Sequence, residues 1–512
     1  MIRYTRHAVF LAVSGLATAA WAQTAPAAAP APAAPPGVPG AAETPTPAPT
    51  PAEAPPPPAL TPADAARLDE IDQVARISLR KHELLEEEAA KKAKEAPRVT
   101  ADDKGFSIGL PDKAFLLRIR GLVQADGRFF LDNDLLASTD TFLIRKFRPY
   151  VEGTVFNLID FRLMPEFAGT VQILDGYVDL HPWEWLRLRA GQMKAPVGLE
   201  RLQGDADRVF LEQSLISNLS SQRDVGVTLW GDVKGGIVHY VVGIFNGAPD
   251  TTSNPTDINH AKDFAARLFF HPFRTDSLKD FGNLGVGVSI QTGNRKGAAD
   301  QATNLTTPLS PFQTGLSPYR TPGQNRFFQY LAPSTDTTGA LTVFAHERAT
   351  RINPQLYYYY DSFGLLSEYM WLKQGVQKGN TNITQLTNQS AAVTVSYTIN
   401  GRENYDGTTP LVGFDREKGT WGALVLAARW SWLSVDEATF PTYANPIASA
   451  QSANSFGGAI TWVPRRTARY AIAYDQTRFD GGNGTAAMGM NPAVITNRLT
   501  EHVIIGRAQA NF

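Results

Sequence analysis

The sequence contains no cysteine among its 512 residues, which excludes thiolate metal sites, thiol catalysis and disulfide bonds. After residue 22 it also lacks any run of the ~18–20 apolar residues that a membrane-spanning helix requires, so a helical membrane protein is excluded. The formal net charge is only −1, and no basic excess points to a nucleic-acid partner. We expect no cofactor, no bound metal and no nucleic acid.

The first 22 residues have the pattern of a cleaved secretory signal peptide. Basic residues precede an apolar run from Ala8 to Ala20, and Ala20 and Ala22 are the small residues that a signal peptidase reads. Cleavage is expected before Gln23, so the mature protein is exported. An uncleaved N-terminal membrane anchor is the alternative, but the apolar run is too short for one.

Two segments of different composition follow the signal peptide. Residues 23–62 are almost entirely Ala, Pro and Thr, which predicts an extended, disordered spacer. Residues 63–96 are rich in Ala, Leu, Glu, Lys and Arg, and they predict a periplasmic helix that begins at Pro62 and stops before Pro97. The apolar stripe of this helix is thin, so both a coiled-coil bundle and a solvated linker fit it.

From about residue 113 to residue 512 the sequence alternates apolar and polar positions in segments of about ten to twelve residues. In the segment that starts near Ala114, Phe115 and Leu117 lie on one face, whereas Arg118 and Arg120 lie on the other. Because side chains alternate along a strand, each predicted strand has one apolar face and one charged face.

The number and spacing of these segments predict a closed barrel. Sixteen segments are counted, with expected starts near residues 114, 141, 160, 171, 186, 223, 236, 262, 282, 340, 363, 389, 418, 452, 467 and 500. Alternate connections are short turns, such as 157–160, and the others are long and polar, such as 293–338; the stretch 400–417 departs by being long where a turn is expected. An even number of strands with this arrangement of connections is typical of outer-membrane barrels, whose closure satisfies the backbone inside lipid.

The sequence therefore predicts an all-β fold, a 16-stranded antiparallel transmembrane β-barrel over residues 113–512, in the outer membrane of a Gram-negative bacterium. Aromatic residues near strand ends fit the girdles of such barrels, although ordinary hairpin packing is the alternative. They are Trp183, Trp185, Tyr357 to Tyr360, Tyr369, Trp371, Trp430, Trp432, Trp462 and Tyr470.

Arginine dominates the basic residues of the predicted barrel, with 27 arginines against 10 lysines. An arginine binds phosphate through two parallel hydrogen bonds and stays charged at physiological pH. The arginines expected to face the lumen are Arg118, Arg120, Arg128, Arg187, Arg189, Arg429, Arg469 and Arg507. The acidic residues expected there are Asp126, Glu152, Glu166, Asp179, Glu368 and Asp475. For each arginine two roles stay open, attraction of anions into the pore or pairing with a carboxylate that stiffens the wall.

Residues 188–200, LRAGQMKAPVGLE, resemble the "LGQFKxPFGLE" segment of the phosphate-selective porin O/P family. Phe210-Leu211-Glu212 and residues 221–226, SQRDVG, are similar to the "ER…RDxG" continuation of that family. Further similar segments are 365–369, 400–405 and 509–512. The resemblance spans residues 113–512 and implies a trimeric sixteen-stranded porin, general or anion-preferring, whose third external loop folds into the lumen.

The resemblance also implies which residues narrow the channel. Arg201 and Arg208 of the loop 198–222, with Lys194 and Arg223 at its ends, are expected at the constriction. Arg145 and Lys146 resemble a pair of basic residues of the family, and one of the two is expected to face the lumen. The strand at residues 264–267 carries one arginine where strongly phosphate-selective members have a ladder, which argues against high phosphate specificity.

Three functions from different classes were compared. The first is a passive porin for small hydrophilic solutes that prefers anions, contacts outer-membrane lipid and forms a homotrimer. The second is an envelope tether, in which the barrel anchors the Pro-rich arm and the helix. The third is a barrel enzyme, but the eight histidines are scattered outside any recognisable triad or metal-ligand spacing, so we expect no catalysis.

Overall fold

The structure is a computed structural model. It describes residues 61–102, 105–131, 138–250, 257, 260–274, 279–297, 314–333, 336, 340–485 and 494–512. The predicted signal peptide (1–22) and the predicted spacer up to residue 60 lie outside the described residues. Within the described ranges no helix is both long and apolar enough to cross a membrane.

A single long helix precedes the barrel in the described part of the chain. Helix α1 spans Pro62–Glu95, and the Oγ1 atom of Thr61 accepts a hydrogen bond from the backbone N–H of Asp64 (3.3 Å), which caps the start. Its larger apolar side chains, Ile71 and Ile77 among them, are exposed. The predicted helix is therefore confirmed. Its apolar stripe is exposed, and both a coiled coil and a solvated linker remain as predictions for it.

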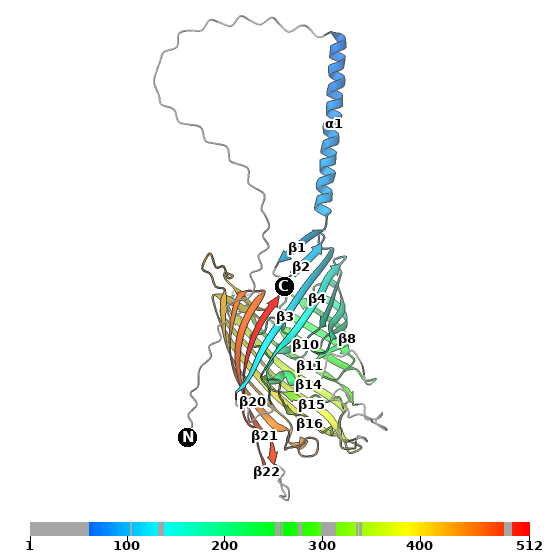
Figure 1. Ribbon diagram of the computed structural model, residues 1–512. Helices are drawn as coiled ribbons and strands as arrows, with labels where there is room; N and C mark the ends of the chain where they lie inside the picture. The colour runs from blue at the N-terminus through cyan, green and yellow to red at the C-terminus, as the bar shows by residue number, and fades with distance from the viewer. Residues whose placement is uncertain are drawn as a thin grey trace, which may run out of the picture. The chain divides into compact units, whose positions relative to one another are not determined.

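Sixteen strands of the described residues form one closed antiparallel barrel (Figure 1). They are β3 (Phe115–Leu131), β4 (Thr141–Val155), β5 (Ile159–Glu166), β6 (Gln172–Trp183), β7 (Leu186–Lys194), β8 (Arg223–Val233), β9 (Val238–Phe245), β10 (Asp263–Phe270), β11 (Leu284–Lys296), β14 (Val343–Tyr360), β15 (Phe363–Lys378), β16 (Thr384–Ile399), β19 (Ala423–Ser434), β20 (Ala450–Arg465), β21 (Ala468–Thr485) and β23 (Glu501–Asn511). Strand β23 pairs with β3, from His502 opposite Leu131 to Asn511 opposite Leu122, and closes the cylinder. The predicted fold class is confirmed.

The alternation of the sequence decides which face of each strand is outside. In β3 the outward side chains Phe115 and Ile119 are 43% and 46% exposed, whereas the inward Gln124 and Asp126 are 0% and 3% exposed. Every barrel strand starts within five residues of its predicted start. The predicted and observed starts agree because a strand that slipped by one residue in its pairing would turn its apolar face toward the polar lumen.

Most connections at one rim are short, as predicted. The link between β14 and β15 has two residues, and Asp361 there adopts a left-handed φ of 48°. Two links at this rim are longer. One joins β10 to β11 through residues 271–283. The other is the stretch 400–417, which contains a small hairpin of β17 (Gly401–Asn404) and β18 (Gly407–Pro410). We call this end the short-turn rim and the opposite end the long-loop rim.

A second hairpin, which the alternation pattern does not predict, adds to the wall before the first barrel strand. Strands β1 (Arg98–Asp102) and β2 (Gly105–Gly109) pair with each other, and β2 pairs with β3 from Phe106 opposite Ile119 to Gly109 opposite Leu116. The rings of Phe106 and Phe512 meet edge-on, 6.0 Å apart. The hairpin therefore continues the wall beyond the point where the C-terminal strand ends.

Loops fill one side of the bore. The smaller elements are α2 (Leu199–Leu202), η2 (Leu215–Asn218), η3 (Lys279–Phe281), β12 (Tyr319–Arg320), β13 (Arg326–Phe328), η5 (Glu437–Thr439) and β22 (Val494–Asn497). Leu215 and Ile216 of η2 and Phe328 of β13 belong to one buried apolar cluster, together with inward side chains of β15, β16, β19, β20 and β21. Because this cluster excludes water from that side, any open path must lie along the other strands.

Candidate functional site

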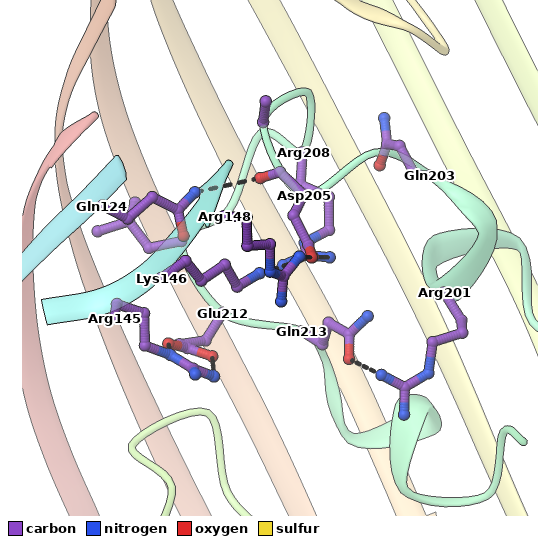
Figure 2. A network of polar contacts seen from close by, with 12 residues as sticks. Gln124, Arg145, Lys146, Arg148, Arg201, Gln203, Asp205, Arg208, Glu212 and Gln213 are labelled. Atoms are coloured by element: carbon purple, nitrogen blue, oxygen red, sulfur yellow. Dashed lines mark hydrogen bonds and ion pairs between the residues drawn. The ribbon is translucent and has the colours of Figure 1, made fainter. Parts of the chain in front are cut away.

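The loop 195–222 between β7 and β8 lies inside the barrel and is fastened there by two carboxylates. Asp205 forms an ion pair at 2.7 Å with the ammonium group of Lys146 and also pairs with Arg148 and Arg208. Figure 2 shows the side chains of Lys146 and Arg148 extending from β4 toward Asp205. The loop is thus held by charge as well as by its apolar contacts.

Glu212 forms the second attachment of the loop. It accepts two hydrogen bonds from Arg145, at 2.6 Å and 2.9 Å (Figure 2). It accepts one more from Arg128 at 2.8 Å. Arg507 of β23 lies 3.3 Å away and also binds Asp126 through two hydrogen bonds of 2.7 Å. Three arginines from three strands therefore meet at one loop carboxylate.

Both loop carboxylates are held in the charged form. Burial alone would raise the pKa of Asp205, but Arg208, Lys146 and Arg148 hold this pKa well below its ordinary value. Burial would also raise the pKa of Glu212, and the charge and hydrogen bonds of Arg145 lower it far below its ordinary value. Asp205 and Glu212 are therefore charged throughout the physiological pH range.

The expectation that only one of Arg145 and Lys146 faces the lumen is wrong. The register of β3 and β4 shifts between Gln124 and Ala125, so that Gln124 lies opposite Lys146 and Ala125 opposite Ile144. This β-bulge leaves Arg145 as an extra residue and turns both basic side chains inward, where Arg145 binds Glu212 and Lys146 binds Asp205.

The basic residues expected at the constriction have several partners. The ammonium group of Lys194 donates to the backbone carbonyls of Leu202 (3.2 Å) and Gln203 (2.9 Å) at the end of α2. Arg201 donates to the side chain of Gln213 at 2.9 Å (Figure 2), and burial together with the charge of Arg223 lowers the pKa of Arg201 to about 10. Arg223 binds Asp175 at 2.6 Å.

Several wall arginines pair with the acidic residues that were also expected to face inward. Arg120 lies 3.2 Å from Glu152, Arg189 lies 2.6 Å from Asp179, and Arg429 lies 2.9 Å from Asp475. Arg128, Arg145 and Arg208 are likewise paired with loop carboxylates. Each of these arginines therefore has a carboxylate partner, and those that line the open cavity stay available for either of the two roles.

An open cavity of about 640 Å³ runs along the inner face of β3 to β10. Eight basic residues line it, namely Arg120, Arg148, Arg162, Arg189, Lys194, Arg223, Arg267 and Arg466, against four aspartates, Asp175, Asp205, Asp207 and Asp406. An adjoining cavity of about 250 Å³, which reaches Arg118 and Arg187, shares Arg162, Tyr177, Arg189 and Trp230 with it. The two cavities together are lined by ten basic and seven acidic residues.

Arginine and aromatic side chains alternate from strand to strand around this cavity. We call the following residues, one from each of β3 to β10 in order, the arginine–aromatic belt: Arg120, Tyr150, Arg162, Tyr177, Arg189, Trp230, His239 and Arg267. Of the belt, the sequence predicted only Arg120 and Arg189 as pore residues. It missed Arg162, Arg267, His239 and the three larger rings. The alternation of each strand could have placed them inside, but aromatic residues were expected at the membrane interfaces.

The hairpin of β17 and β18 meets the loop from the short-turn rim. The hydroxyl of Tyr405 donates to the backbone carbonyl of Leu199 at 2.6 Å, and the amide of Gln203 donates to the backbone carbonyl of Tyr405 at 2.8 Å. The turn residues Tyr405 and Asp406 also line the larger cavity. The long stretch that departs from the turn pattern is thus part of the lumen.

A closed antiparallel barrel of sixteen strands, with a polar cavity and a loop fastened in its bore, is the architecture of an outer-membrane channel. A sequence profile of the phosphate-selective porin O and P family matches residues 117–500, and the chain belongs to this family. A comparison with curated proteins found no match.

Solved structures of similar fold come from several bacteria. They include the outer-membrane channel DcaP of Acinetobacter baumannii (11% identity, 79% of this chain and 99% of that chain, TM-score 0.45). An anion-selective porin from Comamonas acidovorans has 10% identity and covers 78% of this chain and 100% of its own, with a TM-score of 0.44. The trimer form of OmpT of Vibrio cholerae has 11% identity over 78% of this chain and 99% of its own, with a TM-score of 0.43.

Removing the loop attachments should open the bore. In the double variant Asp205→Asn, Glu212→Gln, the buried cations of β4 lose their charge partners, which costs roughly 3–5 kcal/mol for a buried pair. We expect a larger and noisier single-channel conductance in planar bilayers. The control is Asp361→Asn, because the Arg402–Asp361 pair is exposed at the short-turn rim. A double variant with the wild-type conductance would contradict the attachment.

The conductance should be insensitive to mild acid. Because the pKa values of Asp205 and Glu212 are lowered, their ion pairs stabilise the loop at every pH above the ordinary carboxyl pKa of about 4. This stabilisation is lost only as the pH falls from there through the lowered values. Single-channel recordings from pH 7 to pH 3 should therefore stay constant down to about pH 4.5. A transition centred near pH 6 would contradict this expectation and would assign control of the loop to another group, such as Glu368, which accepts hydrogen bonds from the backbone N–H groups of Leu199 and Glu200.

Proposed function

We propose that the protein is a passive porin for small hydrophilic solutes that prefers anions. The observation that carries the proposal is the excess of basic residues around the open cavity, eight against four aspartates. A low-dielectric wall focuses the field of such charges and raises the local concentration of anions. The phosphate-selective family to which the chain belongs supports the same preference.

We divide the predicted pore residues into three groups on this basis. Arg118, Arg120, Arg187, Arg189, Lys194 and Arg223 line the cavities and are proposed to attract anions. Arg128, Arg145, Lys146 and Arg208 bind the loop carboxylates and are proposed to position the loop. Arg201 contacts Gln213 and is proposed to keep the loop in shape. High phosphate specificity is not part of the proposal, since most of these cations already have protein partners.

Ion selectivity tests the proposal directly. In a planar bilayer with asymmetric KCl, the reversal potential should favour chloride at 0.1 M salt and fade toward 1 M, where the Debye length falls from about 10 Å to about 3 Å. Arg267→Gln should weaken the preference by about a quarter, because the net excess of four lining charges falls to three.

The matched control for this experiment is Arg348→Gln, which removes the same charge from an exposed position of β14 outside the cavity lining. It should leave the reversal potential unchanged. Cation preference of the wild-type channel at low salt would refute the anion preference.

We further propose that three copies associate through the outer face of β2 to β5 and β23. These strands carry a group of outward phenylalanines, Phe106, Phe115, Phe129, Phe142 and Phe147. Their sequences contain no tryptophan, and their one tyrosine, Tyr150, faces the cavity. Since tyrosine and tryptophan mark the surface that meets lipid headgroups, a sector without them suits contact with protein, while the rest of the outer wall suits lipid.

A charge in this sector should prevent association. Phe142 is 81% exposed, and Phe142→Arg should convert the trimer into monomers on native gels, because an arginine would be buried there without a partner. Phe142→Leu should keep the trimer. Leu229→Arg, on the outward face of β8, controls for a general effect of charge on the barrel. A trimer that survives Phe142→Arg would place the contact elsewhere on the wall.

A further inference from the structure

The arginine–aromatic belt holds its guanidinium groups against rings. Arg189 lies 4.3 Å from the ring centre of Tyr177 and 4.8 Å from that of Trp230. Arg187 lies 4.7 Å from the same tryptophan ring. Tyr150 has two such neighbours, Arg162 at 4.8 Å and Arg120 at 5.3 Å. Each ring fixes the plane of a guanidinium group through a cation–π contact.

A ring positions a guanidinium group and leaves its charge in place. A carboxylate partner positions the group but cancels its charge. Three of the four belt arginines also have carboxylate partners. Arg120 and Arg162 share Glu152 at 3.2 Å and 3.7 Å. Arg162 also lies 3.5 Å from Asp175, and Arg189 lies 2.6 Å from Asp179. Arg187 has no ion pair among the residues that the structure describes, and Arg267 hydrogen-bonds the neutral side chain of Gln355 at 2.8 Å. The belt therefore presents ordered hydrogen-bond donors whose charge is only partly compensated.

The same cavity has a substantial apolar lining. Leu122, Met164, Met193, Pro196, Leu202 and Val241 line it beside the rings. An inorganic ion gains nothing from such surface, because a hydrated anion loses water there without a replacement partner. A solute with an apolar body gains from the burial of its own apolar surface. The volume of about 640 Å³ leaves room for such a body.

We propose that the belt is a binding site for organic anions with a flat, apolar body, of which aromatic monocarboxylates are the simplest. This inference rests on the proposed anion preference and names the class of anion. The carboxylate accepts hydrogen bonds from the guanidinium edges of the belt, which suit two parallel bonds. The flat body lies against the rings and the apolar lining, for example near Tyr177 and Met193.

Channel block in planar bilayers tests the class of solute. With the full-length protein in KCl, benzoate should reduce the single-channel current at concentrations at least tenfold lower than acetate or inorganic phosphate require. Benzyl alcohol, which has the ring without the charge, should not block. Equal block by benzoate and acetate would overturn the inference, and so would block by benzyl alcohol at the concentration at which benzoate acts.

Variants of the rings test the site. Trp230→Leu keeps an apolar side chain and removes the ring, and it should raise the half-blocking concentration of benzoate five- to tenfold. Tyr177→Leu should act in the same direction, and Tyr177→Phe, which keeps the ring, should restore most of the block. The matched control is Trp371→Leu, because Trp371 faces outward from β15 and is 41% exposed. Loss of block in the control, or none in Trp230→Leu, would overturn the assignment.

The reversal potential in KCl without benzoate separates this inference from the proposed function. Cation preference would refute the proposed function itself. Anion preference together with equal block by benzoate and acetate would leave the porin function standing and refute only the binding site for aromatic anions.

Discussion

A charge inside a closed barrel must be compensated, and this constraint decides what each inward arginine does. The sixteen strands direct half of their side chains into a confined space. A buried charge without a partner there lowers the free energy of unfolding by roughly several kcal/mol. On the side that the loops fill, the charges are paired with carboxylates, as Arg507 is with Asp126 and Arg429 with Asp475. Along β3 to β10 the arginines have carboxylate partners as well, as Arg189 has Asp179, but several of them also lie against rings and line the open cavity. The two sides of the bore therefore differ in their access to water and not in whether their arginines are paired.

The loop 195–222 is what creates the two sides. Its apolar residues, Leu215 and Ile216, are completely buried in the cluster that closes the bore toward β15 to β21. Its carboxylates, Asp205 and Glu212, bind basic residues of β3, β4 and β23. The apolar contacts are made to strands on one side of the lumen and the ion pairs to strands β3, β4 and β23. The loop therefore spans the bore and leaves the cavity on one side. The constriction thus depends largely on wall residues outside the open path, such as Arg128, Lys146 and Arg507, whereas Arg148 both binds Asp205 and lines the cavity.

The sequence predicts the wall better than the contents of the bore. The strand starts can be predicted because the alternation of apolar and polar side chains is a local pattern. Lipid on one face of the wall and water on the other reinforce it. A β-bulge breaks the alternation without a signal in composition, which is why both Arg145 and Lys146 face inward. Partners such as Asp126 and Arg507 are 381 positions apart, and only closure of the barrel brings them together. Tyr357, assigned to a membrane girdle, instead stacks on Tyr405 inside the lumen, because aromatic type alone does not distinguish the two faces.

The preference of this bore for arginine over lysine follows from the same constraint. A lysine ammonium is a compact, strongly hydrated charge, and it needs water or oxygen atoms around it; Lys194 and Lys146 accordingly point at carbonyl and carboxylate oxygens. A guanidinium group is planar and weakly hydrated, so one face can lie on a ring while its edge stays available. Arginine therefore suits the positions beside Tyr150, Tyr177 and Trp230 around the cavity better than lysine does. Replacing the rings by carboxylates would order the same arginines equally well, but it would cancel the field that draws anions into the channel.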